Sequence, residues 1–143
     1  MWSEGVNMDP KKPTFIGDMP HTWVGSDYIR SFLDMFAYER ESDSTLVLAA
    51  GVKDEWANSG ETVKVSNLST HYGPLSYTIT TNGSAVTFSL RPGTRIPPGG
   101  IVIKSPRTMP VMSARVNGSA TPVTNSEVHI RALPATILLE YEK

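Results

Sequence analysis

The segment from Leu75 to Leu90 constrains the fold more than any other part of the chain. It reads LSYTITTNGSAVTFSL, with apolar and small polar residues alternating on both sides of Asn82-Gly83. Asn-Gly is the preferred pair for a two-residue type I′ turn, because both positions need positive φ. A turn at this pair predicts a β-hairpin with four facing pairs of residues: Thr81 with Ser84, Ile79 with Val86, Tyr77 with Phe88, and Leu75 with Leu90.

This hairpin has one apolar face and one face of Ser, Thr and Ala. A slip of one residue would turn every large apolar side chain toward water, so turn chemistry and burial favour the same faces. The sequence therefore predicts that one face of the hairpin lies on the core.

Length and charge exclude several classes of protein. At 143 residues the chain has the size of one domain and can bury a core of its own. Its net charge of −1 gives no basic excess for gripping phosphates, so we expect no nucleic-acid partner. It has no apolar run of roughly 18 residues, so we expect no membrane partner.

The ends and the cysteine count say little about the compartment. The first residues, MWSEGV, lack the basic and apolar regions of a signal peptide. The absence of cysteine excludes disulfides and thiolate metal sites but is compatible with any compartment. The localisation therefore stays open.

Short strand patterns recur along most of the chain and are separated by turn residues, among them 11 Gly and 11 Pro. Besides the two strands of the hairpin, the patterns fall at 45–52, 61–66, 101–103, 111–116, 128–130 and 137–141. Short strands at regular spacing are typical of an antiparallel sandwich. The prediction is a mainly β fold, an antiparallel β-sandwich of about seven to nine strands over residues 44–142, with one N-terminal α-helix.

One segment before the strands has helical periodicity. Ile29, Phe32, Leu33 and Phe36 follow the i, i+3, i+4, i+7 spacing of a helix stripe, and Ser26 suits an N-cap. The sequence predicts a helix over about 26–38, within a single domain at 25–143. Residues 1–24 contain turn formers without apolar periodicity and are expected to be an extended or loosely ordered lead.

Motifs of established catalytic or metal-binding chemistry are absent. The sequence contains no phosphate-binding glycine loop, no His-Glu-x-x-His and no Gly-x-Ser-x-Gly, and its three histidines stand far apart. We therefore assign no catalytic residue, no metal ligand and no cofactor.

Two stretches combine aromatic and polar residues that could face a carbohydrate. The first contains Asp18, His21 and Trp23, and the second is the group Trp56, His71 and Tyr72. Aromatic rings stack on sugar C–H surfaces, and the polar side chains can bond hydroxyls. The alternative is structural: Trp23 packs against the sheet, His21 is a loop residue, and Trp56 plugs the edge of the core.

The segment from Phe15 to Glu39 resembles the final helix of a bacterial (α/α)6-barrel, six-hairpin glycoside hydrolase. The residues after it are similar to the β-sandwich that closes such enzymes. The resemblance rests on LVLAAGV at 46–52, YGPLSY at 72–77, PPGGIVI at 97–103, VNG at 116–118 and LPA at 133–135.

This resemblance implies that the chain is the C-terminal part of a larger bacterial enzyme and carries none of its catalytic residues. Its function would be that of a non-catalytic accessory β-sandwich that packs against the missing catalytic (α/α)6 domain. The alternative is an independent carbohydrate-binding module that holds a glycan with exposed aromatic loop residues. An enzyme complete in this chain is disfavoured, since no paired catalytic groups are present. Without the barrel, the helix face is expected to stay exposed and to promote self-association.

Overall fold

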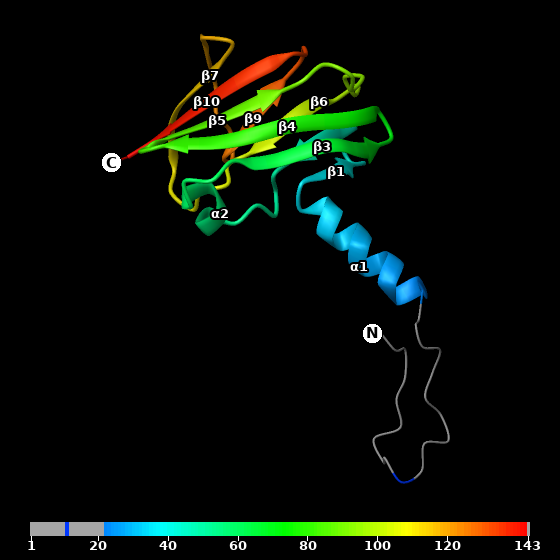
Figure 1. Cartoon of the computed structure of the whole chain (residues 1–143). Helices are drawn as coiled ribbons and strands as arrows, with labels where there is room; N and C mark the ends of the chain where they lie inside the picture. The colour runs from blue at the N-terminus through cyan, green and yellow to red at the C-terminus, as the bar shows by residue number, and fades with distance from the viewer. Residues whose placement is uncertain (1–10, 12–21, 143) are drawn as a thin grey trace. The chain divides into compact units, whose positions relative to one another are not determined.

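The computed structural model describes residue 11 and residues 22–142 (Figure 1). Most of the expected lead at 1–24 therefore lies outside the described residues. The chain divides into two compact units, Met1–Asp34 and Met35–Lys143, where the sequence predicted a single domain at 25–143.

The N-terminal helix α1 spans Thr22–Asp34, so it begins and ends four residues before the predicted 26–38. Ser26 consequently lies inside the helix and is not its N-cap. Three residues of the predicted stripe, Ile29, Phe32 and Leu33, lie on the helix, whereas Phe36 follows it and packs against the core of the sandwich. No residue of α1 is buried: Ile29 is 58% exposed and Leu33 40% exposed. The helix stops early because the next residues pair with a strand, and such tertiary pairing overrides helical periodicity.

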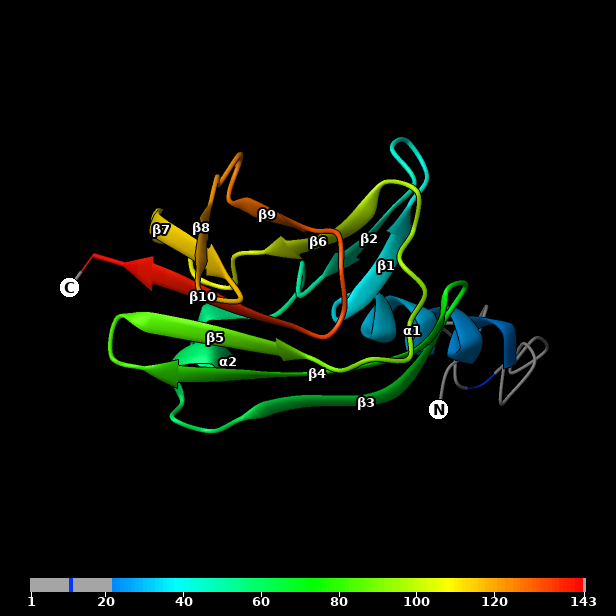
Figure 2. The same ribbon diagram turned by 90° about the horizontal axis from the view of Figure 1, so that it is seen from above.

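The second unit is a sandwich of two β-sheets (Figures 1 and 2). Its ten strands are β1 (Ala37–Arg40), β2 (Thr45–Leu48), β3 (Val63–Thr70), β4 (Gly73–Asn82), β5 (Ala85–Leu90), β6 (Gly100–Lys104), β7 (Val111–Val116), β8 (Ser119–Thr121), β9 (Glu127–Ile130) and β10 (Ala135–Tyr141). Between β2 and β3, the short helix α2 (Asp54–Asn58) carries Trp56.

One sheet has the strand order β1-β2-β6-β9, and the other has β3-β4-β5-β10-β7-β8. Every described pair of strands is antiparallel except β2 with β6, which is parallel. The mainly β sandwich is thus as predicted, with one more strand than expected and one parallel pair. The parallel pair arises because the chain leaves the first sheet after β2, builds β3, β4 and β5, and then returns.

The β4–β5 hairpin has the predicted faces but a different register. Tyr77 pairs with Leu90, Ile79 with Phe88, and the turn consists of Gly83 and Ser84. The prediction was therefore wrong by two residues in pairing. Gly83, with φ of 58°, occupies the first turn position, as in a type II′ turn. A shift of two residues preserves the side-chain alternation, so the same apolar side chains still face inward.

The core lies between the two sheets, and its described members all belong to the second unit. Its largest fully buried side chains include Tyr77, Phe88, Leu46, Ile101 and Ile137. β2 is buried at all four positions. Asn117 and Gly118 form the turn between β7 and β8, with positive φ at both residues.

Candidate functional site

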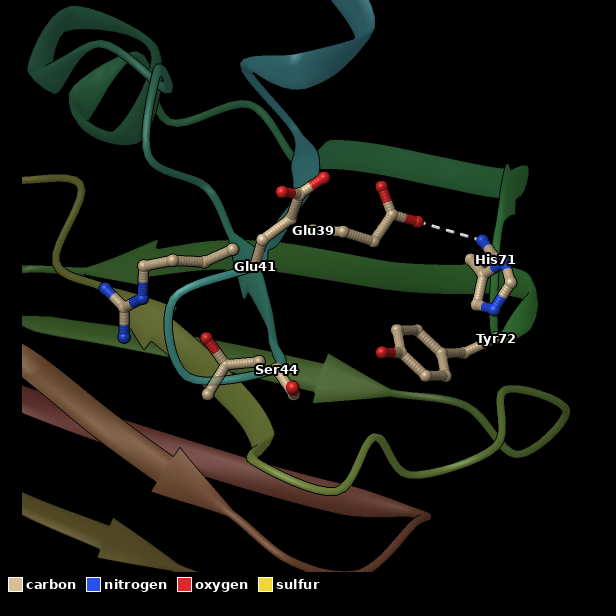
Figure 3. A pocket seen from close by; sticks show the side chains of 7 residues that line it. Glu39, Glu41, Ser44, His71 and Tyr72 are labelled. Carbon is tan, nitrogen blue, oxygen red and sulfur yellow. Dashed lines mark hydrogen bonds between the residues drawn. The ribbon is translucent and has the colours of Figure 1, made fainter.

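A pocket of about 550 Å³ lies at one end of the sandwich (Figure 3). Its walls come from β1, the start of β2, and the turn between β3 and β4. The lining residues are Glu39, Arg40, Glu41, Ser44, Thr45, His71 and Tyr72.

The β3–β4 turn presents His71 and Tyr72 to this pocket. Thr70 and Gly73 pair across the turn, and the Thr70 hydroxyl fixes it by donating to the Gly73 carbonyl at 2.7 Å. Arg95 holds the turn from outside: its backbone N–H donates to the Tyr72 carbonyl at 2.8 Å. The rings of His71 and Tyr72 then meet edge to face, with centroids 5.3 Å apart.

A carboxylate joins the two walls of the pocket. Glu39 on β1 accepts a hydrogen bond from the backbone N–H of His71 at 2.8 Å, as Figure 3 shows. Glu41 follows directly after β1 and is exposed. The two carboxylates therefore belong to one wall, and the Tyr72 ring belongs to the other.

The Arg40 guanidinium lines the pocket but is already engaged by two carboxylates. It binds Glu127 through two hydrogen bonds of 3.0 and 3.3 Å, and it binds Asp43 at 2.8 Å. The hydrogen bonds from Arg40 and Thr45 lower the pKa of Asp43 from 3.8 to about 2. The pKa of Glu127 is also lowered, chiefly by its hydrogen bonds with Arg40. Arg40 thus ties β1 to β9 and leaves little positive charge for a ligand.

The pocket can hydrogen-bond a polyhydroxy ligand and offer it one aromatic ring. Glu39 and Glu41 accept hydrogen bonds, and the hydroxyls of Ser44 and Tyr72 can donate or accept. Among the described residues, no group of three or more His, Cys, Asp or Glu side chains could hold a metal ion. The two glutamates share a wall, whereas glycosidase chemistry needs carboxyl groups on either side of the scissile bond.

Of the residues predicted to face a carbohydrate, three belong to the second unit: His71 and Tyr72 line the pocket, and Trp56 does not. Asp18 and His21 lie outside the described residues, and Trp23 belongs to α1, where it is 72% exposed. Trp56 packs against the core and stacks on Phe36 with ring centroids 6.2 Å apart, which is the structural alternative given above.

Sequence reasoning did not identify the carboxylate wall. Glu39 and Glu41 fall in the charged run ERESD, directly after the predicted helix, and nothing there marks a strand. Their alternation around Arg40 is compatible with an edge strand. Only the pairing of β1 with β2 shows that Glu39 and Arg40 belong to a strand.

Compared with known proteins, the chain matches no family model, no curated protein and no solved structure. In the part of the chain that the structure describes, no helix has the length and apolar character needed to cross a membrane.

Proposed function

We propose that this chain is a non-catalytic accessory β-sandwich of a larger carbohydrate-active enzyme, with α1 as the element that contacts the catalytic barrel. The observation that supports this function is an amphipathic helix that belongs to a separate unit from the core of the sandwich. Every described residue of the sandwich's core cluster belongs to the second unit. Ile29 and Leu33, one turn apart on α1, are both exposed.

An exposed apolar stripe on a helix is costly unless a partner covers it. Burying one such side chain contributes roughly 1.5–3 kcal/mol, and contiguous exposed apolar surface commonly marks an interaction site. The helices of an (α/α)6 barrel would pack against this stripe in the usual ridges-into-grooves manner. The accessory function therefore gives α1 a role that the sandwich alone does not require.

The full reading frame tests the proposal directly. We expect it to encode helical hairpins before these residues, with the paired carboxylates of a glycosidase among them. A frame with no barrel-forming segment would refute the accessory function. The separate chain should hydrolyse no glycoside, and hydrolysis abolished by one substitution within these 143 residues would contradict the proposal.

Self-association tests the role of the helix face. Without a barrel, α1 should pair with a second copy, so light scattering should show an apparent mass that rises with concentration. Ile29→Lys should reduce that rise, because it places a charge in the apolar stripe. Ser31→Lys is the matched control on the opposite side of the helix and should leave the rise unchanged. Equal effects of the two variants would count against the stripe as the contact.

A second function, independent glycan binding, is favoured by one observation: Tyr72 shares a pocket with Glu39 and Glu41. Affinity electrophoresis through gels containing soluble polysaccharides would reveal such binding as retardation. Glu41→Gln should remove the retardation, whereas Glu61→Gln, an exposed residue outside the pocket, should not. A chain that migrates freely in every gel would leave the accessory function alone.

A further inference from the structure

The chain contains the same tripeptide twice, Asn82-Gly83-Ser84 and Asn117-Gly118-Ser119, each at a β-turn. Asn-Gly is the dipeptide in which an asparagine side chain most readily reacts with the next backbone nitrogen, because glycine has no side chain to shield that nitrogen. The two copies have the same local chemistry. Any difference in their reactivity must therefore come from the fold.

The structure holds the two asparagines differently. The side-chain oxygen of Asn117 accepts a hydrogen bond from the backbone N–H of Thr136 at 2.8 Å, and the Asn117 N–H donates to the Thr136 carbonyl at 2.8 Å. Asn117 is thus bound to β10 through both its side chain and its backbone. Asn82 is exposed, and its side chain makes no hydrogen bond with the described residues.

The turn that follows Asn82 also leaves room for a cyclic intermediate. Gly83 is exposed, and a Cβ placed on it would meet nothing within 4 Å. The Gly83 N–H makes no backbone hydrogen bond within the described chain, since it lies in the turn between β4 and β5. Reaction then requires only a local opening at the end of the hairpin.

We propose that Asn82 is a site of spontaneous deamidation in the folded protein and that Asn117 is protected. The Gly83 nitrogen loses its proton to solvent and attacks the side-chain carbonyl carbon of Asn82. The bond from that carbon to the side-chain nitrogen breaks, and the nitrogen leaves as ammonia after taking up a proton. Water then opens the resulting succinimide. Opening at the side-chain carbonyl gives aspartate, and opening at the backbone carbonyl gives isoaspartate.

The products change the central hairpin of the larger sheet. Both add a negative charge next to Gly83, whose carbonyl accepts a hydrogen bond from Arg107 at 2.8 Å. The isoaspartate product also inserts an extra carbon into the backbone where β4 enters the turn. The modification site therefore lies where a covalent change alters both the local charge and the strand connection.

The two identical tripeptides allow an internally controlled experiment. The full chain is kept in mildly alkaline buffer, folded or in urea, and peptides around both sites are followed by mass spectrometry. In the folded protein, Asn82 should deamidate at least roughly tenfold faster than Asn117, which must first release its hydrogen bonds to Thr136. In urea, the two rates should converge.

A substitution separates this route from direct hydrolysis of the amide. Gly83→Ala should slow deamidation of Asn82 in the folded chain and leave the rate at Asn117 unchanged. The proposal is overturned if the two asparagines react at equal rates in the folded chain. It is also overturned if Asn82 reacts only in urea, or if Gly83→Ala leaves its rate unchanged.

Discussion

Replacing Gly99 with alanine should destabilise the sandwich through a collision with the neighbouring backbone. Gly99 lies in the Pro-Pro-Gly-Gly run that leads into β6. A Cβ at this position would lie 2.1 Å from the Asp43 carbonyl oxygen and 2.7 Å from that of Ser44. Both atoms belong to the backbone, so no side-chain rotation can relieve the contact. The Gly99 N–H also donates to the Ser44 carbonyl at 2.9 Å, so the segments cannot separate without losing this bond.

The expected cost follows from two contributions. Overpacking a close contact costs about 1–3 kcal/mol, and the loss of one hydrogen bond costs about 1 kcal/mol. Gly99→Ala should therefore lower the free energy of unfolding by about 2–4 kcal/mol. For a domain of this size, that loss corresponds to a fall in Tm of roughly 5–15 °C.

Gly60→Ala is the matched control, because it introduces backbone strain without a steric contact. Gly60 has a φ of +80°, yet a Cβ there would meet nothing within 4 Å. Its substitution should cost only about 1 kcal/mol of backbone strain. Urea titrations followed by circular dichroism would compare the variants. If Gly99→Ala costs no more than Gly60→Ala, the close approach of residues 43 and 44 to residue 99 is not tight, and the reasoning is refuted.

Three further outcomes are expected. Gly83→Val should cost well over 1 kcal/mol in urea titration, because a β-branched residue resists positive φ; an unchanged midpoint would place the turn elsewhere. Tyr77→Phe should cost about 1 kcal/mol, since the buried hydroxyl donates to the Phe36 carbonyl at 2.8 Å; a neutral result would show that this bond adds nothing. The Asp43 carboxylate has a lowered pKa of about 2 and so stabilises the fold above its unfolded pKa near 3.8, an effect lost as pH falls toward 2. Because Asp43 is substantially exposed, salt should screen this effect, and Asp43→Asn should flatten the acid limb of stability; an unaltered acid limb would contradict the role of Arg40 as its partner.

The hairpin shows how far alternation can predict a sheet. The period-two pattern on either side of Asn82 is sufficient to decide which side chains are buried. It does not decide the pairing, because a shift of two residues buries the same set. The choice between an Asn-Gly turn and a Gly-Ser turn depends on the whole sheet, including the pairing of β5 with β10.

The first strand shows why the helix boundary was wrong. Phe36, Ala37 and Tyr38 continue a helical pattern as readily as they begin a strand, and only the pairing with β2 decides between them. The pocket depends on the same pairing. His71 and Tyr72 were identifiable as aromatic turn residues, whereas Glu39 and Glu41 became a pocket wall only through the position of β1 beside the β3–β4 turn.

The position of β10 bears on how the protein can be made. Among the described strands, β10 comes last along the sequence, but it lies between β5 and β7 inside the larger sheet. A nascent chain can therefore pair β3, β4 and β5, but it cannot join them to β7 and β8 until residues 135–141 have been synthesised. Until then, β5 and β7 each present an open edge, and such edges recruit strands from other chains. Translation arrested before Ala135 should thus give a product prone to aggregation, even though it contains nine of the ten described strands.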